Sequence, residues 1–216
     1  KTPVPTSVPS TGQTSTCDRD DGAWMFLFPL HKININDSLF NQVMDCLSKQ
    51  EKTTPIMVVN SHKYAYELIK DNYNGKQIEL INLDLHHDLF NNSTTLDCGN
   101  WIGHVAKDFK LKSFKWIGRK VSEKMYDLTD EDKIKLHFEL GLTSIANMNF
   151  DAIFICRSDN WTPPHLDVYF EKLLTLCTNM FYDIKVEQSI CEKRDIENNI
   201  KTLKENFNEL QCRHVC

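Results

Sequence analysis

Asp84, His86 and Asp88 lie at the end of an apolar run, in the sequence INLDLHHDLF of residues 81–90. Side chains of these types are costly to bury unless a partner offsets their charge. In extended backbone, residues two apart project to the same side, so this spacing can bring two carboxylates and an imidazole to one point. Oxygen ligands together with an imidazole suit a divalent metal such as Mn²⁺, Zn²⁺ or Fe²⁺. The spacing therefore predicts a metal site; the alternative is a polar strand end in which Asp84 and Asp88 cap the backbone.

The elements that would position these residues alternate between short apolar runs and helical patterns. The sequence predicts a strand or extended arm at residues 23–30 and strands at 55–59, 78–85, 113–118, 151–157 and 183–188. It predicts helices at residues 36–49, 62–74, 100–109, 129–140, 163–178 and 194–210. This alternation is typical of a mainly parallel sheet covered by helices, so we expect a three-layer α/β sandwich. Ligands gather at the carboxyl ends of the strands in such sheets, which is where Asp84 lies.

The composition indicates one domain behind a linker. Residues 1–20 are rich in Pro, Ser and Thr and are expected to form a flexible leader, whereas residues 21–216 are expected to form a single α/β domain. The net charge of -5 does not favour nucleic acid as a partner. No apolar run approaches the roughly 20 residues of a membrane span, so no membrane is expected and a cytoplasmic location is the default expectation.

The eight cysteines form no C-x-x-C pair, and several lie within apolar patterns. Buried free thiols are the expectation for these positions. Cys191, Cys212 and Cys216 lie near the C-terminus and could pair in an oxidising compartment, and the sequence leaves this alternative open.

Four motifs resemble those of a known enzyme superfamily in the same chain order. DLHHD is similar to the D-x-H-x-D metal motif of the arginase and agmatinase (ureohydrolase) superfamily, whose fold is shared with the histone deacetylases. VVNSH at residues 58–62, TTLDCGNWIGH at 94–104 and ICRSDNWTPP at 155–164 resemble further segments of that superfamily. The set looks closest to the small divergent branch that contains the peptide arginases, which convert arginine side chains in peptides to ornithine and urea. The resemblance spans about residues 55–170.

The resemblance implies a set of metal ligands and a substrate. His62, Asp84 and Asp88 would surround one metal, His86 and the bridging Asp84 would bind a second, and Asp159 would join them from a later strand. The implied cofactor is Mn²⁺, as one or two ions, with Zn²⁺ as an alternative. A metal-activated hydroxide would attack the guanidinium carbon of arginine in a peptide or protein.

The resemblance also suggests residues that act on the substrate. His104 is the candidate for protonating the departing amine, because an imidazole changes charge near neutral pH, and Asp88 is the second catalytic candidate. The alternative for His104 is a helix-face histidine with no chemistry. Asn100 and Trp101 would form the wall of the site or contact the substrate, and the alternative for Trp101 is a buried side chain that serves only as packing. Glu187 resembles the late-strand glutamate that pairs with the substrate guanidinium.

One position departs from the superfamily pattern. The second metal strand of the superfamily usually carries two aspartates as S-x-D-x-D, whereas this chain has Asp159 and, two residues earlier, Arg157. An arginine directed at a metal is repulsive, so either Arg157 points away or the second cation is weak or missing. A single zinc at Asp84, His86 and Asp159 would instead resemble the deacetylase site and attack an amide. A third reading is a catalytically degenerate interaction domain that keeps the fold.

Overall fold

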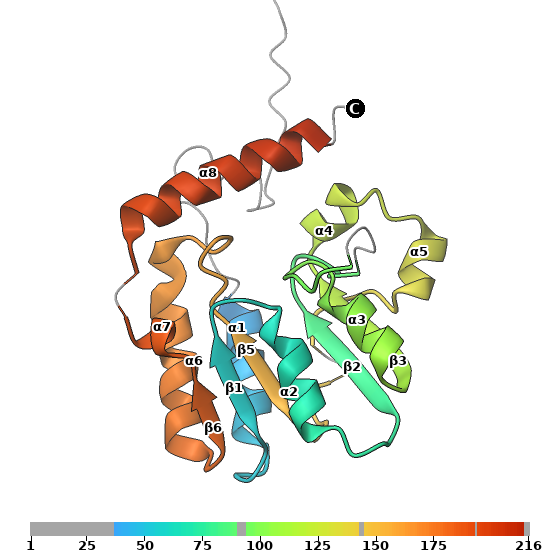
Figure 1. The fold of residues 1–216 in the computed structure, drawn as a ribbon, viewed down its shortest axis with the longest axis vertical. Helices are drawn as coiled ribbons and strands as arrows, with labels where there is room; N and C mark the ends of the chain where they lie inside the picture. The colour runs from blue at the N-terminus through green and yellow to red at the C-terminus, as the bar shows by residue number, and fades with distance from the viewer. Residues whose placement is uncertain (1–36, 90–93, 143–144, 193, 214–216) are drawn as a thin grey trace, which may run out of the picture.

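The computed structural model describes residues 37–89, 94–142, 145–192 and 194–213 as an α/β fold (Figure 1). The strands are β1 (Ile56–Val59), β2 (Ile78–Leu83), β3 (Leu111–Gly118), β4 (Glu139–Leu140), β5 (Ile153–Cys156) and β6 (Ile184–Val186). The helices are α1 (Asp37–Ser48), α2 (Tyr64–Asn72), α3 (Trp101–Asp108), α4 (Lys120–Met125), α5 (Asp130–Lys135), α6 (Asp167–Met180), α7 (Gln188–Cys191) and α8 (Ile196–Arg213), with a 3₁₀ turn at Pro164–Leu166.

The described strands form two sheets of three strands each, with the orders β5-β1-β6 and β2-β3-β4. Every pair of neighbouring strands is parallel, as the sequence predicts. The arrowheads of β1, β2 and β6 point the same way in Figure 1. Two small parallel sheets therefore stand where a single sheet was expected.

Alternate residues of β1 face two different layers of helices. Ile56 and Val58 pack into a cluster with side chains of α1 and α6, while Met57 and Val59 pack with Leu68 of α2. All four residues of β1 are buried, which is why this strand reads as an uninterrupted apolar run rather than as an alternating one. The first sheet is consequently the middle of three layers.

The helices of both layers extend beyond the first sheet to cover the second. On one side, Val43 of α1 packs with Ile81 of β2 and Ile117 of β3. On the other side, Ile102 and Val105 of α3 pack in a cluster with Leu80 of β2 and with residues of α2. The two sheets are thus held together by helices whose apolar side chains pack against both of them.

The main differences from the predicted elements are the end of the helix predicted at 129–140 and two additional short helices. The helix predicted at 129–140 ends at Lys135, because His137 adopts a φ of 45° and the chain then enters β4. A capping box between Thr129 and Asp132 fixes its start. The short helices α4 and α7 were not predicted. The extended segment predicted at residues 23–30 and the leader at 1–20 lie outside the described residues.

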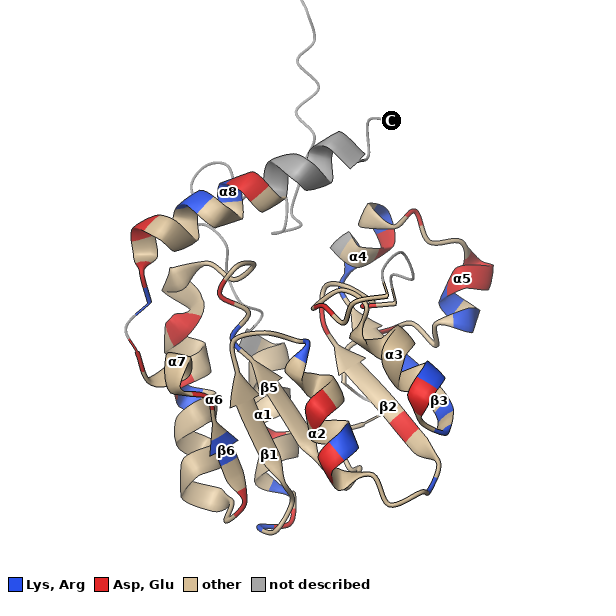
Figure 2. Cartoon of the chain, viewed as in Figure 1, with Lys and Arg blue, Asp and Glu red and all other residues tan. Residues whose placement is uncertain are grey.

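Charged side chains lie mainly on the outer helices. Both signs of charge occur together along α5 and α8 in Figure 2, while β1 carries no charged residue. Among the described residues, no helix has the length and apolar character needed to cross a membrane. Cys46, Cys98, Cys156, Cys177 and Cys191 are free thiols, and burial raises the pKa of Cys177 to about 11.

The central position of β1 generates a prediction about stability. The side chain of Ile56, on β1, is buried against α1 and α6. Ile56→Ala is therefore expected to lower the free energy of unfolding by about 2–5 kcal/mol, because apolar burial is lost and a cavity remains. Ile134→Ala is the matched control, because Ile134 is 75% exposed on α5 and its loss should change stability by less than about 0.5 kcal/mol. Urea unfolding followed by circular dichroism measures both. Equal stability of the two variants would contradict this packing.

Candidate metal centre

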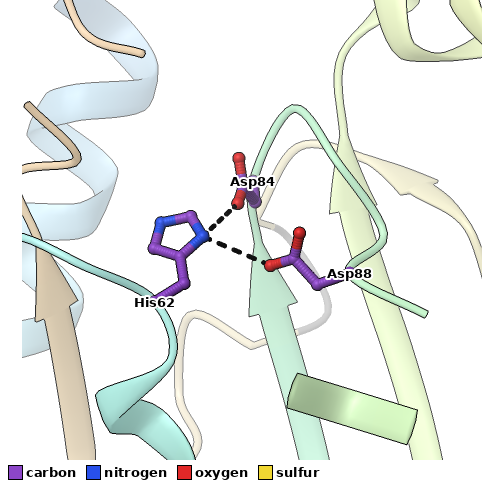
Figure 3. A group of neighbouring side chains, drawn as sticks. All are labelled: His62, Asp84 and Asp88. Carbon is purple, nitrogen blue, oxygen red and sulfur yellow. Dashed lines mark ion pairs between the residues drawn. The ribbon is translucent and has the colours of Figure 1, made fainter. Parts of the chain in front are cut away.

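Three side chains from the carboxyl ends of two strands converge at one point. The Nδ1 atom of His62, after β1, lies 3.1 Å from Oδ2 of Asp84 and 3.3 Å from Oδ2 of Asp88, both of which follow β2. Figure 3 shows the imidazole directed between the two carboxylates. One ligand atom from each residue lies within 4.8 Å of the others, so this triad of His62, Asp84 and Asp88 offers one nitrogen and two oxygens to a single ion.

The turn after β2 is held by hydrogen bonds to its backbone from neighbouring elements. Trp116 Nε1 of β3 donates to the carbonyl of Asp84 at 2.9 Å, and Ser122 Oγ of α4 donates to the carbonyl of Leu85 at 2.9 Å. Asn82 Nδ2 donates to the carbonyl of His86 at 3.1 Å. Each carbonyl of residues 84–86 therefore accepts a hydrogen bond, and these bonds stabilise the turn that carries the carboxylates.

Asp88 is the most buried member of the triad, at 2% exposure. Its φ of 51° is in the left-handed region, which aspartate tolerates better than most residues. Trp101 Nε1 donates to Asp88 Oδ2 at 2.8 Å, and the backbone N–H of Ile102 donates to the Asp88 carbonyl at 3.3 Å. The first turn of α3 therefore fixes both the backbone and the side chain of Asp88.

Asp84 carries the oxygen that the protein leaves without a hydrogen bond. Its Oδ1 accepts from the backbone N–H of His86 at 3.3 Å. Its Oδ2 is buried and receives no hydrogen bond from the described residues, although His62 Nδ1 lies at ion-pair distance. Burying such an oxygen without a donor is costly, and a bound cation offsets that cost. The donor set and this orphaned oxygen together fit a divalent ion.

The electrostatics of the triad reflect the same crowding of negative charge. Burial raises the pKa of the Asp84 carboxyl, and the neighbouring Asp88 raises it further, against the opposing effect of His62. Burial lowers the pKa of His62, but its interactions with Asp88, Cys156 and Asp84 outweigh burial and raise that pKa to about 11. In the metal-free protein His62 is thus an imidazolium, and its charge partly neutralises the two carboxylates.

His86 lies beside the triad but contributes no atom to it. Its Nδ1 is 3.9 Å from Oδ1 of Asp84, and its ring lies edge-on to Trp161 with centroids 5.4 Å apart. Burial lowers the pKa of His86, so its imidazole is neutral at pH 7. A neutral imidazole next to a metal ligand is able to accept a proton.

The described residues do not bring Asp159 into the triad. Arg157 donates to both carboxylate oxygens of Asp159, through Nε at 2.6 Å and Nη2 at 2.8 Å. Arg194, at the start of the segment leading into α8, lies 3.2 Å from the same carboxylate and 2.7 Å from Asp167. Arg157 therefore points at Asp159 rather than at a metal, and two guanidinium groups occupy the aspartate that the resemblance assigned to a metal pair.

The remaining predicted residues lie outside the triad. Asn100 is buried and uses its side-chain amide within its own loop, accepting from the N–H of Asp97 and donating to the carbonyl of Thr95. The ring of His104 faces Tyr66 of α2 edge-on, with centroids 6.4 Å apart, and its catalytic role stays a prediction. Glu187 follows β6, and its Oε2 accepts from the N–H of Asn60 at 3.1 Å, close to the end of β1.

Several residues that shape the site carry no signal in the sequence. Trp116, Ser122 and Arg194 are remote from the motifs and reach the site only through the fold. The convergence of Asp84 and Asp88 was predicted, but the geometry differs from the expected one. β2 ends at Leu83, and the two carboxylates meet because the chain turns after it rather than because it stays extended.

The indole of Trp101 generates a prediction about metal affinity. Trp101→Phe keeps the aromatic packing and removes the donor to Asp88, so the Kd for Mn²⁺ or Zn²⁺ is expected to rise about 10–100-fold, as for other partners of metal ligands. Trp161→Phe is the matched control, since Trp161 contacts His86 and not a triad carboxylate. Isothermal titration calorimetry measures both affinities. An unchanged Kd in Trp101→Phe would show that Asp88 does not depend on this hydrogen bond for binding.

The raised pKa of His62 predicts proton release on metal binding. Because the metal-free imidazole is protonated below about pH 11, an ion that takes the Nδ1 position must displace one proton at pH 8. Affinity should therefore rise about tenfold per pH unit as the pH increases toward 11, and fall as the pH decreases. Calorimetry in two buffers of different ionisation enthalpy counts the proton. Binding without proton release would mean that His62 is not a ligand.

Comparisons of the chain with protein-family models, with curated proteins and with solved structures found no match. The arginase-like fold and the ureohydrolase chemistry therefore stay expectations drawn from the resemblance of the motifs.

Proposed function

We propose that this chain is a metal-dependent hydrolase of the ureohydrolase type, which acts on the guanidinium of arginine in a peptide or protein and yields ornithine and urea. The observation that carries the proposal is the convergence of His62, Asp84 and Asp88 around an orphaned, buried carboxylate oxygen. These three residues would hold one divalent ion, and Mn²⁺ or Zn²⁺ suits their donors. The bound ion would supply a hydroxide at neutral pH by lowering the pKa of water.

The residues around the triad have separate tasks in this proposal. Trp101 and the turn donors keep the two carboxylates in place, so the site needs little rearrangement during the reaction. His86 is adjacent to Asp84 and takes the proton-transfer role more readily than His104, whose ring packs against α2. The ring of Trp161 beside His86 forms an apolar wall at this position.

A cationic substrate is favoured by the position of Glu187. This half-buried carboxylate follows β6, the neighbour of β1, and it accepts a hydrogen bond from the N–H of Asn60. Asn60 is two residues before His62, so Glu187 is held near the segment that carries this ligand. One of its oxygens is committed to that bond, and the other is the candidate partner for a substrate guanidinium. Asp159 is a poorer candidate because Arg157 and Arg194 already neutralise it.

Amide hydrolysis with a single zinc ion is the second candidate. The pairing of Asp159 with Arg157 favours it, because the described residues form one possible ligand group, which corresponds to one ion rather than two. The same hydroxide would then attack an amide carbonyl in an acylated side chain. A binding domain without turnover is the third outcome.

The test of the proposal compares two substrates on the metal-loaded full chain. With Mn²⁺, an arginine-containing peptide is expected to release urea and to gain the mass of an ornithine product, whereas an acetyl-lysine peptide stays intact. Asp84→Asn should lower kcat/KM by on the order of 10³-fold, since the ion contributes several kcal/mol to the transition state. Asp45→Asn is the matched control, because Asp45 is exposed on α1 and pairs only with Lys49 among the described residues.

Three results would lead away from the proposal. Deacetylation that depends on Zn²⁺ and on Asp84 would favour the second candidate. Metal binding without turnover of either peptide would leave a metal-stabilised binding domain. Equal activity of Asp84→Asn and the wild-type chain would exclude the triad as the reaction centre.

A further inference from the structure

The loop that follows β5 brings Trp161 to the edge of the candidate metal centre. It spans residues 159–163 and leads into the 3₁₀ turn at Pro164–Leu166. The ring of Trp161 lies edge-on to His86, with centroids 5.4 Å apart, and His86 is next to Asp84 of the triad. The position of this loop therefore decides which side chain lies beside His86.

Two N–H groups of the loop bind within the turn itself. Ser158, which has a φ of 54°, turns the chain after β5. Its carbonyl accepts hydrogen bonds from the backbone N–H of Trp161 at 2.8 Å and of Thr162 at 2.9 Å. Backbone carbonyls also need partners where they are shielded from water. For this loop, donors to the carbonyls come from a distant part of the chain.

Two asparagines of α8 donate to carbonyls of the loop. Asn199 Nδ2 donates to the carbonyl of Asp159. Asn206 Nδ2 donates to the carbonyl of Asn160 at 2.7 Å. The two asparagines are seven residues apart, which is about two turns of helix, so their amides lie on the same side of α8. This side of α8 faces the loop, and α8 also contacts the 3₁₀ turn that follows it.

Arg194, which precedes α8, adds a third bond and orients one of the asparagines. Its Nη1 donates to the carbonyl of Thr162 at 2.6 Å and to Oδ1 of Asn199 at 3.3 Å. Because Oδ1 of Asn199 accepts this bond, Nδ2 is the atom that faces Asp159. Nη2 of Arg194 lies 3.2 Å from the Asp159 carboxylate, so the same guanidinium also holds a side chain of the loop. We call three residues the clamp residues: Arg194, Asn199 and Asn206.

The clamp residues differ in burial. The side chain of Arg194 and the whole of Asn199 are each 5% exposed, whereas Asn206 is half-buried. Water does not readily replace a donor that is lost from a buried place, so the carbonyl it served stays unsatisfied. Asn206 makes its bond nearer to solvent. It is therefore the clamp residue whose replacement disturbs the rest of the fold least.

The bonds fix the backbone on both sides of Trp161. The peptide unit before Trp161 is held at its carbonyl by Asn206 and at its N–H by the carbonyl of Ser158. Beyond Trp161, the N–H of Thr162 binds the same carbonyl, and the carbonyl of Thr162 binds Arg194. The ring of Trp161 can thus leave the candidate metal centre only by rotating about its own side-chain bonds.

We propose that the clamp residues are positioning residues for the candidate metal centre, because they keep Trp161 against His86. The ring contact limits the orientations of the His86 imidazole, and proton transfer requires a defined orientation. The effect on the reaction rests on the proposed function, whereas the hold on the loop does not. The inference also gives Asp159 a task, since both its carboxylate and its carbonyl serve to hold the loop.

Hydrogen exchange of the full chain measures the hold on the loop without requiring activity. In Asn206→Ala, the amides of Trp161 and Thr162 are expected to exchange on the order of tenfold faster than in the wild type, because the loop opens more often. The amides of β1 should keep their protection. Asn198→Ala is the matched control, since Asn198 is exposed on α8. Wild-type exchange of both loop amides in Asn206→Ala would overturn the proposal.

Arg194→Lys gives an independent measurement of the same hold. Lysine keeps the positive charge but has one nitrogen, so it cannot donate to Thr162 and pair with Asp159 as the guanidinium does. The amide of Thr162 is expected to exchange faster in this variant as well. If Asn206→Ala loses the protection of β1, Arg194→Lys decides the question. Unchanged exchange of Thr162 in Arg194→Lys would then overturn the proposal.

A double-mutant cycle tests whether the clamp acts through Trp161. With Mn²⁺ and an arginine-containing peptide, Asn206→Ala is expected to lower kcat about tenfold, because small displacements near the reacting groups are costly. The Kd for Mn²⁺ should change by less than about twofold, since other bonds hold the triad. In a Trp161→Ala background, Asn206→Ala should cause no further loss of kcat. Equal losses in both backgrounds would overturn the role through Trp161.

The two kinds of measurement separate this inference from the proposed function. A wild-type chain that binds Mn²⁺ but releases no urea would contradict the proposed function. Exchange of the Trp161 amide would then decide alone whether the clamp holds the loop. Faster exchange in Asn206→Ala together with wild-type kcat would overturn the positioning role and leave the proposed function standing.

Discussion

The charge of two buried carboxylates is the constraint on which the site depends. Asp84 and Asp88 are held close to one imidazole, and a pair of like charges in a poorly solvated place is unfavourable without a cation. The positive charge of His62, whose pKa is raised, and the hydrogen bond from the Trp101 indole offset part of this repulsion. It does not supply a donor to Asp84 Oδ2 among the described residues. The remaining imbalance is what makes the triad suited to an ion.

The same constraint connects the two sheets. His62 follows β1 in one sheet, whereas both carboxylates follow β2 in the other, so the distance between the sheets sets the geometry of the triad. The shared helices hold that distance by packing against both sheets. Metal affinity is therefore expected to depend on the packing of these shared helices.

Local patterns in the sequence predicted the parts of this structure that depend on local physics. The apolar run of β1 and the amphipathic patterns of α1 and α6 predicted the α/β class with parallel strands. Burial on one or both faces of an element sets the spacing of apolar residues in its sequence. The spacing of Asp84 and Asp88 indicated a shared site, although the turn that unites them was not foreseen. Contacts between distant segments leave no such trace. The ties of Trp116 to the turn and of Arg194 to Asp159 arise only when the chain is folded.

The charge balance around the site argues for a single ion. Arg157 and Arg194 carry two positive charges and lie against Asp159 and Asp167, which carry two negative charges, so this group is neutral by itself. In the triad, one divalent ion with a neutral His62 balances the two carboxylates. A second divalent ion would add two positive charges, whereas the carboxylates of Asp159 and Asp167 are already paired with the two arginines. Recruiting Asp159 for the second ion would in turn leave Arg157 unpaired and buried. The arginine pair thus holds the segment before α8 against Asp159 and Asp167, and it leaves the triad as the group that could hold an ion among the described residues.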